Sequence, residues 1–338
     1  MCRLIDRVGG FPIPQEWLAR SHLSLPELKR RIDSGMWAIT ASGTLLRRGL
    51  STGTISAAAA KAAVLSLAEP VTQVSVLTPS GIRINVRCTS KGGWARAQKP
   101  NSDHPKDVTE GLIFEAKAAA ADEIALAPGE GIGIVKRHEL RVPYGAAAIN
   151  PEARWSIEHA ITEATHDIGL EGALVKLSAV NGAAISQKTL NQKVGVFGGI
   201  SILGTTGFVE PWNECLVDSA ESLAETASKV ALTTGRTGFK YAKLYFPEHT
   251  AVIAGSNLDR VFEKCKGKET VVIGLPALIL KWAKPDILNG ANAGTVQELF
   301  DRDPYAEQIT AALTALRTRT AATIVIINRA GTIIRNIA

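Results

Sequence analysis

Hydrophobic and polar residues follow two different patterns along the chain. In residues 71–88, apolar side chains alternate with polar ones on either side of a Pro-Ser-Gly turn, which predicts paired strands with one buried face. The segments 229–234, 250–255, 270–274 and 322–328 are mostly apolar throughout, and stretches with helical spacing separate them. Strands that are buried on both faces and alternate with helices are typical of a parallel sheet. The pattern therefore predicts an α+β domain followed by a Rossmann-like α/β domain with a mainly parallel sheet.

The change of pattern divides the chain of 338 residues into three predicted parts. Residues 1–46 have apolar positions at helical spacing and a glycine stop at Gly35, which predicts a helical N-terminal extension. Residues 47–193 are the predicted α+β domain, which begins with a Gly/Thr turn and an alanine-rich helix that ends before Pro70. Residues 194–338 are the predicted Rossmann-like domain.

The third part is predicted to begin with a strand at 200–203, followed by a glycine-rich turn and by Pro211 in the first turn of a helix. That arrangement would place the turn at the carboxyl edge of the sheet, where open α/β folds bind ligands. The predicted helices of this part cover 211–227, 237–246, 257–265, 276–284 and 295–317.

Composition narrows the range of partners. The net charge is +6, but Lys and Arg are scattered among acidic residues, so nucleic acid is not expected and a small polyanion fits better. The four cysteines form no CxxC pair and no Cys/His cluster, which predicts reduced thiols and no zinc site. The sequence has no run of 18 apolar residues and no signal-peptide pattern, so we expect a cytoplasmic protein without membrane association.

The sequence Gly204-Thr205-Thr206-Gly207 is the first candidate binding element. Glycine loses more backbone freedom on folding than any other residue, so two glycines here suggest that a ligand approaches the backbone closely. Amides at a helix start would then face a ligand oxygen. The alternative is a tight turn in which the threonines only cap the backbone. Glu210 follows the turn and could orient a substrate, accept a proton or only complement the helix dipole.

Two more glycine elements follow the same reasoning. Thr52-Gly53-Thr54 precede the alanine-rich helix, where hydroxyls and amides could form an anion pocket or simply cap the helix. Gly131 and Gly133 lie in a stretch that lacks the acidic partner and the following helix of a dinucleotide fingerprint. We interpret that stretch as a bend beside a cleft. The sequence contains none of the familiar catalytic motifs, and its histidines show no metal spacing.

Taken in order, several segments resemble one known family, the cobalt-precorrin-5B C1-methyltransferases of anaerobic cobalamin synthesis. The resemblance extends from about Arg47 to the region of Lys281, and its longest and most specific block is Gly198–Pro211. The segments that carry it are RRGLSTGTISAAAAKAA, DVTEG, GEGIGIV, AAINPEAR, KTLNQKVGVFGGISILGTTGFVEPW and TTGRTGFKYA.

The resemblance implies that the methyl group of S-adenosylmethionine is transferred to C1 of a cobalt-containing corrinoid, giving cobalt-precorrin-6A. Cobalt would arrive inside the substrate, so no metal site of the protein is expected. The predicted donor-binding residues are Gly199, Ser201, Gly204, Thr205, Thr206 and Gly207. The predicted substrate-binding residues are Arg47, Arg48, Thr52, Gly53, Thr54, Gly131, Gly133, Asn150 and Arg154.

The chemistry of such a transfer suggests roles for charged residues. Sulfur, methyl and carbon must lie in line, within contacts of about 3 to 3.5 Å, so positioning should matter more than acid–base catalysis. A carboxylate could accept the proton that leaves, and Glu210 or Asp103 is the predicted group. The acetate and propionate arms of the substrate suit basic side chains near the loops, among them Arg47, Arg48 and Arg154.

The sequence also departs from the family pattern. Ile55 stands where many members have cysteine, and Leu275 stands in the position of a histidine, so neither a thiol nor an acid–base histidine is predicted there. The loop with Asp103, His104 and Asp107 is one residue longer than usual. Two other functions stay open: a nucleotide-dependent oxidoreductase, and a corrinoid carrier without catalysis. Association with a second copy or with other enzymes of cobalamin synthesis also stays open.

Overall fold

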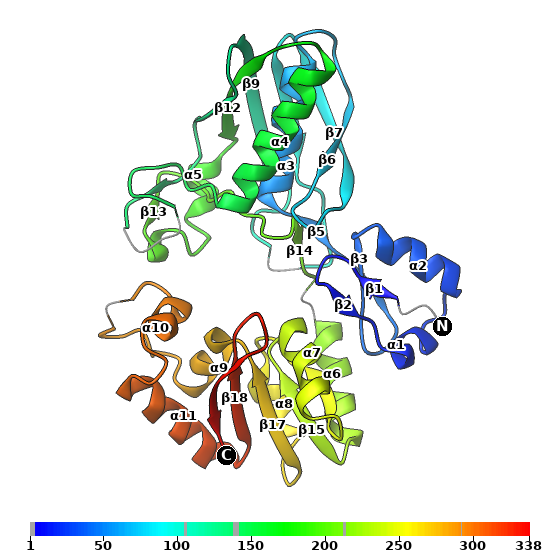
Figure 1. Cartoon of the computed structure of the whole chain (residues 1–338), viewed down its shortest axis with the longest axis vertical. Coiled ribbons are helices and arrows are strands. Elements are labelled where there is room, and N and C mark those ends of the chain that lie inside the picture. Colours follow the sequence, from blue (N-terminus) through cyan, green and yellow to red (C-terminus); the bar gives the residue numbers. More distant parts are fainter. Residues whose placement is uncertain (1–3, 105–106, 138–141, 212–213, 292) are drawn as a thin grey trace.

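The computed structural model describes residues 4–104, 107–137, 142–211, 214–291 and 293–338. Figure 1 shows two large units, one above the other, and a small unit beside their junction. The small N-terminal unit comprises residues 4–48, the upper unit 49–211, and the lower unit 214–338.

The N-terminal unit combines short helices with short strands. Where the sequence predicts a helical extension, the structure has two helices, α1 (Gln15–Ala19) and α2 (Leu25–Asp33). It also contains two antiparallel strand pairs that the sequence did not indicate: β1 (Ile5–Asp6) with β2 (Phe11–Pro12), and β3 (Trp37–Ile39) with β4 (Leu45–Arg47). The Trp17 ring packs against Phe239 of the lower unit, with ring centroids 5.3 Å apart. The small unit therefore shares a hydrophobic core with the lower unit.

The upper unit is built on a sheet with the strand order β10-β12-β9-β8-β7-β6. Neighbouring strands are antiparallel except for β10 and β12, which are parallel. The alternating burial along β7 confirms the predicted strands with one buried face. The bounds are β6 (Gln73–Leu77), β7 (Arg83–Lys91), β8 (Trp94–Gln98), β9 (Ile113–Ala121), β10 (Ala125–Pro128) and β12 (Gly172–Ala179).

Two helices cover this sheet. α3 (Thr52–Leu65) contacts both the sheet strands and α4 (Pro151–Asp167), so it lies between them. Its residues are buried from Thr52 to Val64, which explains why most of them are small or apolar on every side of the helix. Its small alanine side chains let the neighbouring elements approach closely. The predicted alanine-rich helix is thus confirmed, as the central element of the upper core.

The last part of the upper unit consists of short elements. β13 pairs antiparallel with β11, and β14 pairs antiparallel with β5 next to the start of α3. These pairings return the chain to the upper unit before it enters the lower one. The bounds are β5 (Gly49–Leu50), β11 (Ile134–Val135), α5 (Gly182–Ser186), the 3-10 helix η1 (Gln192–Val194), β13 (Val196–Phe197) and β14 (Phe208–Val209).

The segment 200–203 does not begin the parallel sheet. Ile200 and Ile202 form isolated bridges with Ile132 and Ile149, and all four side chains belong to the upper core. The prediction of a first parallel strand here is therefore wrong. An apolar run alone does not distinguish a sheet strand from an extended segment that fills a core.

The lower unit contains a sheet with the order β16-β15-β17-β18-β19. The neighbours among β16, β15, β17 and β18 are parallel, which confirms the strands predicted from residue 229 onward. β19 adds an antiparallel edge strand that the sequence did not indicate, so the sheet is mixed. The bounds are β15 (Lys229–Thr233), β16 (Thr250–Ile253), β17 (Glu269–Gly274), β18 (Thr323–Ile327) and β19 (Ile333–Ile337).

Helices alternate with the parallel strands of the lower unit, as predicted. The predicted segment 295–317 is divided into two helices, because Pro304 cannot continue a helix. The bounds are α6 (Glu214–Thr226), α7 (Arg236–Tyr245), α8 (Leu258–Glu263), α9 (Pro276–Ala283), α10 (Val296–Arg302) and α11 (Glu307–Thr320).

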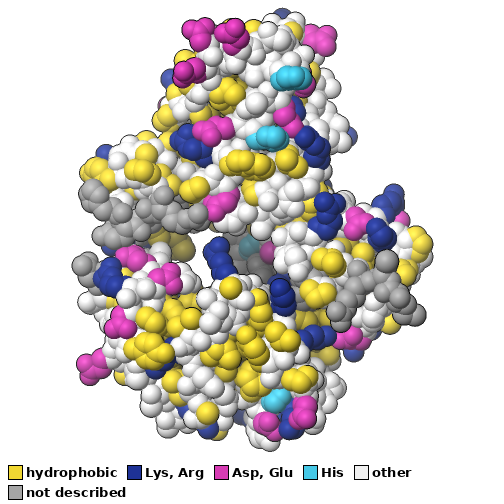
Figure 2. Space-filling model, viewed as in Figure 1, with side chains coloured by type: hydrophobic (Ala, Val, Ile, Leu, Met, Phe, Trp, Pro, Cys, Tyr) yellow, Lys and Arg dark blue, Asp and Glu magenta, His cyan; other side chains and the backbone are white. Residues whose placement is uncertain are grey.

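The carboxyl ends of the parallel strands point toward the upper unit. Figure 1 shows this from the red turn between β18 and β19, which lies at the top of the lower unit. The strand order reverses between β15 and β17, and open α/β sheets bind ligands in the crevice at such a point. In Figure 2 the surface is hollowed between the upper and lower units, with Lys and Arg side chains at the edge.

Candidate active site

A hollow of about 400 Å³ opens in the upper unit beside both Gly/Thr turns. Ser51 and Thr52 line it from the start of α3, and Gly204 and Thr205 line it from the second turn. This volume falls within the range of small-molecule sites, roughly 300 to 1,000 Å³. The other described lining residues are Lys99, Thr109, Thr189, Leu190, Asn191, Ile200, Ser201, Leu203, Phe208 and Val209.

A second hollow, of about 840 Å³, continues from the first toward the lower unit. The two share Leu190, Asn191, Ser201 and Leu203 in their walls. The opposite wall of the second hollow comes from the lower unit, from residues 295–302 at and around α10. The candidate site is therefore a cleft between the two large units.

The two Gly/Thr turns bind each other. Gly53 N donates to Leu203 O over 2.8 Å, and Leu203 N donates to the hydroxyl of Thr52 over 2.8 Å. The hydroxyl of Thr54 donates to Gly207 O over 2.7 Å. These amides and hydroxyls, which the sequence suggested as an anion pocket, are used to fix one turn against the other. Their contribution to the site is a rigid wall.

The other predicted glycines hold backbones close together. A Cβ on Gly131 would lie 2.1 Å from Ala179 O, and one on Gly199 would lie 2.2 Å from Gly131 O. A Cβ on Gly133 would lie 2.8 Å from Gly199 O. Larger residues at these positions would force the segments apart. The close packing supports Ile200, whose amide donates to Gly131 O over 3.0 Å, in the wall of the first hollow.

The structure brings Lys99, Asp107 and Thr109 together at the first hollow, where sequence reasoning named only Asp107. Lys99 is 2% exposed, and its Nζ donates to Thr109 Oγ1 over 2.9 Å and to the carboxylate of Asp107. Thr109 Oγ1 donates in turn to Asp107 Oδ1 over 2.6 Å. Burial would raise the pKa of Asp107, but the hydrogen bonds from Lys99 and Thr109 outweigh it and lower that pKa. The sequence feature that could have pointed to Lys99 is its position directly after a strand with alternating polarity, at the start of the loop that contains Asp103 and Asp107.

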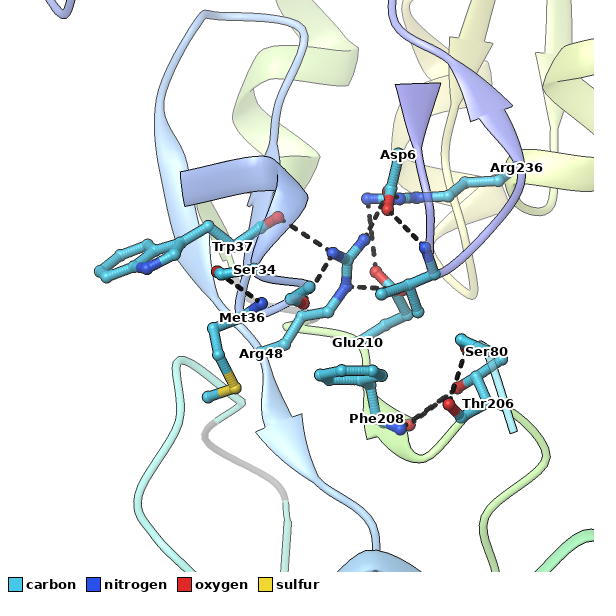
Figure 3. A network of polar contacts seen from close by, with 12 residues as sticks. Asp6, Ser34, Met36, Trp37, Arg48, Ser80, Thr206, Phe208, Glu210 and Arg236 are labelled. Atoms are coloured by element: carbon cyan, nitrogen blue, oxygen red, sulfur yellow. Dashed lines mark hydrogen bonds and ion pairs between the residues drawn. The ribbon is translucent and has the colours of Figure 1, made fainter. Parts of the chain in front are cut away.

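Glu210 lies in a buried ion-pair cluster at the junction of the three units (Figure 3). Arg48 is 0% exposed and donates to Asp6 Oδ2 over 2.5 Å and to Glu210 Oε1 over 2.9 Å. Arg236, the first residue of α7, pairs with the same two carboxylates. Arg48 also donates to the backbone oxygens of Gly35 and Trp37. The geometry gives Arg48 and Glu210 the role of joining the units, and it puts their side chains among protein partners.

Arg236 is the member of this cluster whose pKa burial shifts most clearly. Burial lowers the pKa of Arg236 to about 10, which still leaves the guanidinium protonated. Two arginines thus face two carboxylates beside the start of α7. In a dinucleotide-binding fold this helix start would attract a phosphate. Here the local positive charge is already neutralised by Asp6 and Glu210, which disfavours the alternative of a nucleotide-dependent oxidoreductase.

Of the remaining predicted residues, Asn150 and Thr205 line the hollows, and the others lie outside the lining. Asp103 accepts from the Arg47 amide over 2.6 Å, and both residues are exposed. Asn150 lines the second hollow and caps α4 by accepting from Ala153 N over 3.0 Å. Thr206 accepts hydrogen bonds from Ser80 through its backbone oxygen, whereas Thr205 is exposed in the first hollow. Arg154 is half-buried on α4 and pairs with Glu158.

No group of three or more His, Cys, Asp or Glu side chains suited to a metal ion occurs among the residues that the structure describes. Within the same residues, the structure has no helix of the length and apolarity needed to cross a membrane.

Comparison with known proteins identifies the family. Residues 39–211 match the family model described as CbiD. The chain belongs to the CbiD family. The match covers the upper unit and both Gly/Thr turns, and the prediction made from the signature blocks is thus confirmed.

Relatives extend the similarity to the whole chain. The chain is 44% identical over 332 residues to the cobalt-precorrin-5B C(1)-methyltransferase of Methanococcoides burtonii, covering 98% of this chain and 97% of the relative. It is 44% identical to the protein of the same name from Methanosarcina acetivorans, covering 98% of each. A crystal structure of cobalamin biosynthesis protein (cbiD) from Archaeoglobus fulgidus is similar with a TM-score of 0.68 and 31% identity, covering 96% of this chain and 100% of that one.

Proposed function

We propose that this protein is a cobalt-precorrin-5B C1-methyltransferase, which transfers the methyl group of S-adenosylmethionine to C1 of cobalt-precorrin-5B to give cobalt-precorrin-6A. The observation that carries the proposal is the 41 to 44% identity to relatives of that name over 97 to 98% of the chain. Similarity at that level extends through all three units and so includes both walls of the cleft.

The cleft suits a large, flat ligand together with a smaller one. Its two continuous hollows of about 400 and 840 Å³ exceed what one drug-sized molecule requires. The wall of the first hollow carries hydroxyls from Ser51, Thr52 and Thr205, and small residues such as Gly204. Exposed Arg47 of the N-terminal unit and half-buried Arg154 of the upper unit offer charge for the acid arms of a tetrapyrrole.

Positioning is the task of this chain in the reaction. The donor supplies an electrophilic methyl group, and the ring carbon of the substrate is the nucleophile. No covalent intermediate with the protein is needed. The mutual hydrogen bonds of Thr52, Thr54 and Gly53 with the second turn fix the wall before a ligand arrives. A fixed wall that holds two reactants in contact can lower the barrier by several kcal/mol.

We propose these roles for the predicted residues. Gly199, Ser201 and Gly204–Gly207 form the donor side of the wall, and Thr52–Thr54, Gly131, Gly133, Asn150, Arg47 and Arg154 form the substrate side. Asp103, which is exposed, is the better candidate for accepting a proton, because Glu210 is held by two arginines. Arg48 supports the wall from the junction cluster.

We also propose that the lower unit is a Rossmann-like domain whose carboxyl edge closes the cleft. The parallel order of β16, β15, β17 and β18 supports this, and so does the position of the order reversal next to the upper unit. The pairings of β13 and β14 favour a domain boundary after residue 211 in place of residue 194.

Anaerobic incubation with cobalt-precorrin-5B and a ¹³C-methyl donor tests the function. We expect the label at C1 by NMR, with one equivalent of S-adenosylhomocysteine released. A corrinoid carrier would bind the pigment without releasing S-adenosylhomocysteine. An oxidoreductase would bind a nicotinamide nucleotide, which fluorescence titration would detect. Either result, with no label transferred, would overturn the proposal.

A further inference from the structure

We infer that Lys99 is a carboxylate-binding residue of the first hollow, held in place by Asp107 and Thr109. This inference rests on the proposed function and extends it to a residue that sequence reasoning did not single out. Among the described residues that line this hollow, Lys99 carries the charge, and the others present hydroxyl, amide, backbone or apolar groups. An anionic group of a ligand would therefore find its counter-charge at this position.

The backbone of Lys99 is fixed on both sides. The residue follows β8 directly, its amide donates to Leu112 O over 2.8 Å, and its carbonyl accepts from Gly111 N over 3.2 Å. The side chain is 1% exposed, and Lys99 is one of the residues that line the hollow. Its ammonium group is thus placed with little freedom left to lose on binding, which favours affinity.

The ammonium group retains donor capacity. It has three N–H groups, and in the described part of the chain two are used, by Asp107 and by Thr109 Oγ1. Asp107 also accepts from the Thr109 amide over 3.0 Å, so the carboxylate is fixed in turn. The third N–H can donate to a ligand carboxylate, and Thr205, which is exposed in the same hollow, can add a hydroxyl.

Burying the charge of Lys99 costs free energy, and a role in ligand binding would explain why the protein keeps it. Removing an ion pair from water costs free energy that an apolar pair of the same size would not cost. A pair that only braced the loop 99–112 could be replaced by hydrophobic contact. Its position in the wall of a hydroxyl-lined hollow accounts for the charge, because a ligand that carries a carboxylate needs it there.

The carboxylate has two sources in the proposed reaction: the amino-acid end of the donor, and the acid arms of the corrinoid. Lys99→Met removes the charge and keeps most of the volume. Lys61→Met is the matched control, because Lys61 is also buried and paired with a carboxylate, Glu163, but lies outside the lining of the hollow. If Lys99→Met does not fold by circular dichroism, Lys99→Gln serves the same test.

The readouts are the Kd of S-adenosylhomocysteine, the Kd of methylthioadenosine, which lacks the amino-acid end, and the KM of the corrinoid. If Lys99 holds the donor, Lys99→Met raises the Kd of S-adenosylhomocysteine about 10- to 100-fold and leaves that of methylthioadenosine within threefold. If it holds an acid arm, both Kd values stay within threefold and the KM of the corrinoid rises at least tenfold. Lys61→Met should change none of the three by more than threefold.

Three results would overturn the inference: all values within threefold of wild type in Lys99→Met, equal losses for both nucleoside probes, or equal losses in Lys61→Met. If Lys99→Met binds both nucleosides and the corrinoid and transfers the methyl group as the wild type does, the role of Lys99 is refuted and the proposed function stands. If the wild-type chain transfers no methyl group, the proposed function fails and the inference fails with it.

Discussion

Two buried cations in this molecule make opposite use of their charge. Arg48 at the junction of the units uses its guanidinium for Asp6, Glu210 and two backbone oxygens. Lys99 at the first hollow has two partners among the residues that the structure describes, which leaves one N–H of its ammonium group. The difference teaches that burial and a carboxylate partner do not by themselves mark a binding residue. What distinguishes the two is the donor capacity that remains and the presence of a hollow in front of it.

The largest expected effect comes from removing Arg48, the cation that joins the units. Arg48→Met leaves Asp6 and Glu210 with Arg236 as their remaining guanidinium partner in the cluster. Because a buried pair broken on one side leaves an uncompensated charge, we expect a loss of about 3 to 5 kcal/mol in the free energy of unfolding.

Urea unfolding measures this loss. Arg154→Met is the matched control, since Arg154 forms a partly solvent-exposed pair with Glu158 on α4 and should change the stability by less than about 0.5 kcal/mol. An Arg48→Met protein as stable as the control would contradict the structural role of the cluster.

The second test concerns the rigid wall of the hollow. Gly207 has φ +88°, and a Cβ there would lie 2.5 Å from Thr78 Cβ. Gly198 has a similar φ of +81° but open space around the position of a Cβ. We expect Gly198→Ala to cost about 1 kcal/mol from backbone strain and Gly207→Ala to cost about 2 to 3 kcal/mol, because steric overlap is added. Thermal unfolding compares the stability of the two variants. Equal losses of stability would show that the turn at Gly207 can shift to accommodate a Cβ, and would contradict a rigid wall.

The third test separates filling the hollow from unfolding. Thr205 is exposed and lines the first hollow, so Thr205→Trp should leave the stability within about 0.5 kcal/mol and lower kcat/KM for methyl transfer at least tenfold. Thr318→Trp on α11, also exposed but outside the hollow, should keep full activity. Full activity in both variants would remove this hollow from the proposed site.

The smallest expected effect extends the comparison to a third buried cation, Lys61. Its partner Glu163 also pairs with Arg83, and hydrogen bonds from Arg83 and Lys61 lower the pKa of Glu163 to about 2. A carboxylate with a lowered folded-state pKa stabilises the fold above its unfolded pKa, near 4.5, and this contribution is lost as the pH falls toward 2.

Glu163→Gln should therefore cost about 1 to 2 kcal/mol at pH 7 and flatten the fall in stability between pH 4.5 and 2. Urea midpoints across that range provide the measurement. A variant with the same slope as wild type would show that other carboxylates govern the acid sensitivity.

Much of the fold could be predicted, because its elements have strong local patterns. The alanine-rich helix and the alternating and apolar strands are each specified by residues next to one another in sequence. The segment 200–203 has the same apolar pattern as a sheet strand, and what decides its position is contact with Ile132 and Ile149. Such long-range pairing is not visible in one segment. The edge strand β19 was missed for a similar reason, because its residues Ile333–Ile337 alternate weakly.

The candidate site could be predicted in outline. The two Gly/Thr turns do meet at one hollow, although they lie about 150 residues apart, as Thr54 and Gly207 show. Their hydrogen-bond partners could not be predicted, since each turn satisfies the other. Glu210 and Arg48 looked suitable for a substrate because charge near a loop is visible in sequence, whereas the acid or base that neutralises it, here Asp6 and Arg236, is not.

The junction cluster also has a consequence for biosynthesis of the chain. Arg236 leaves the ribosome long after Asp6 and Arg48, so the complete cluster can form only once α7 has been synthesised. Shortened chains that begin after residue 46 would lose one of its carboxylates, and we expect them to reach the native arrangement slowly and to aggregate on the way.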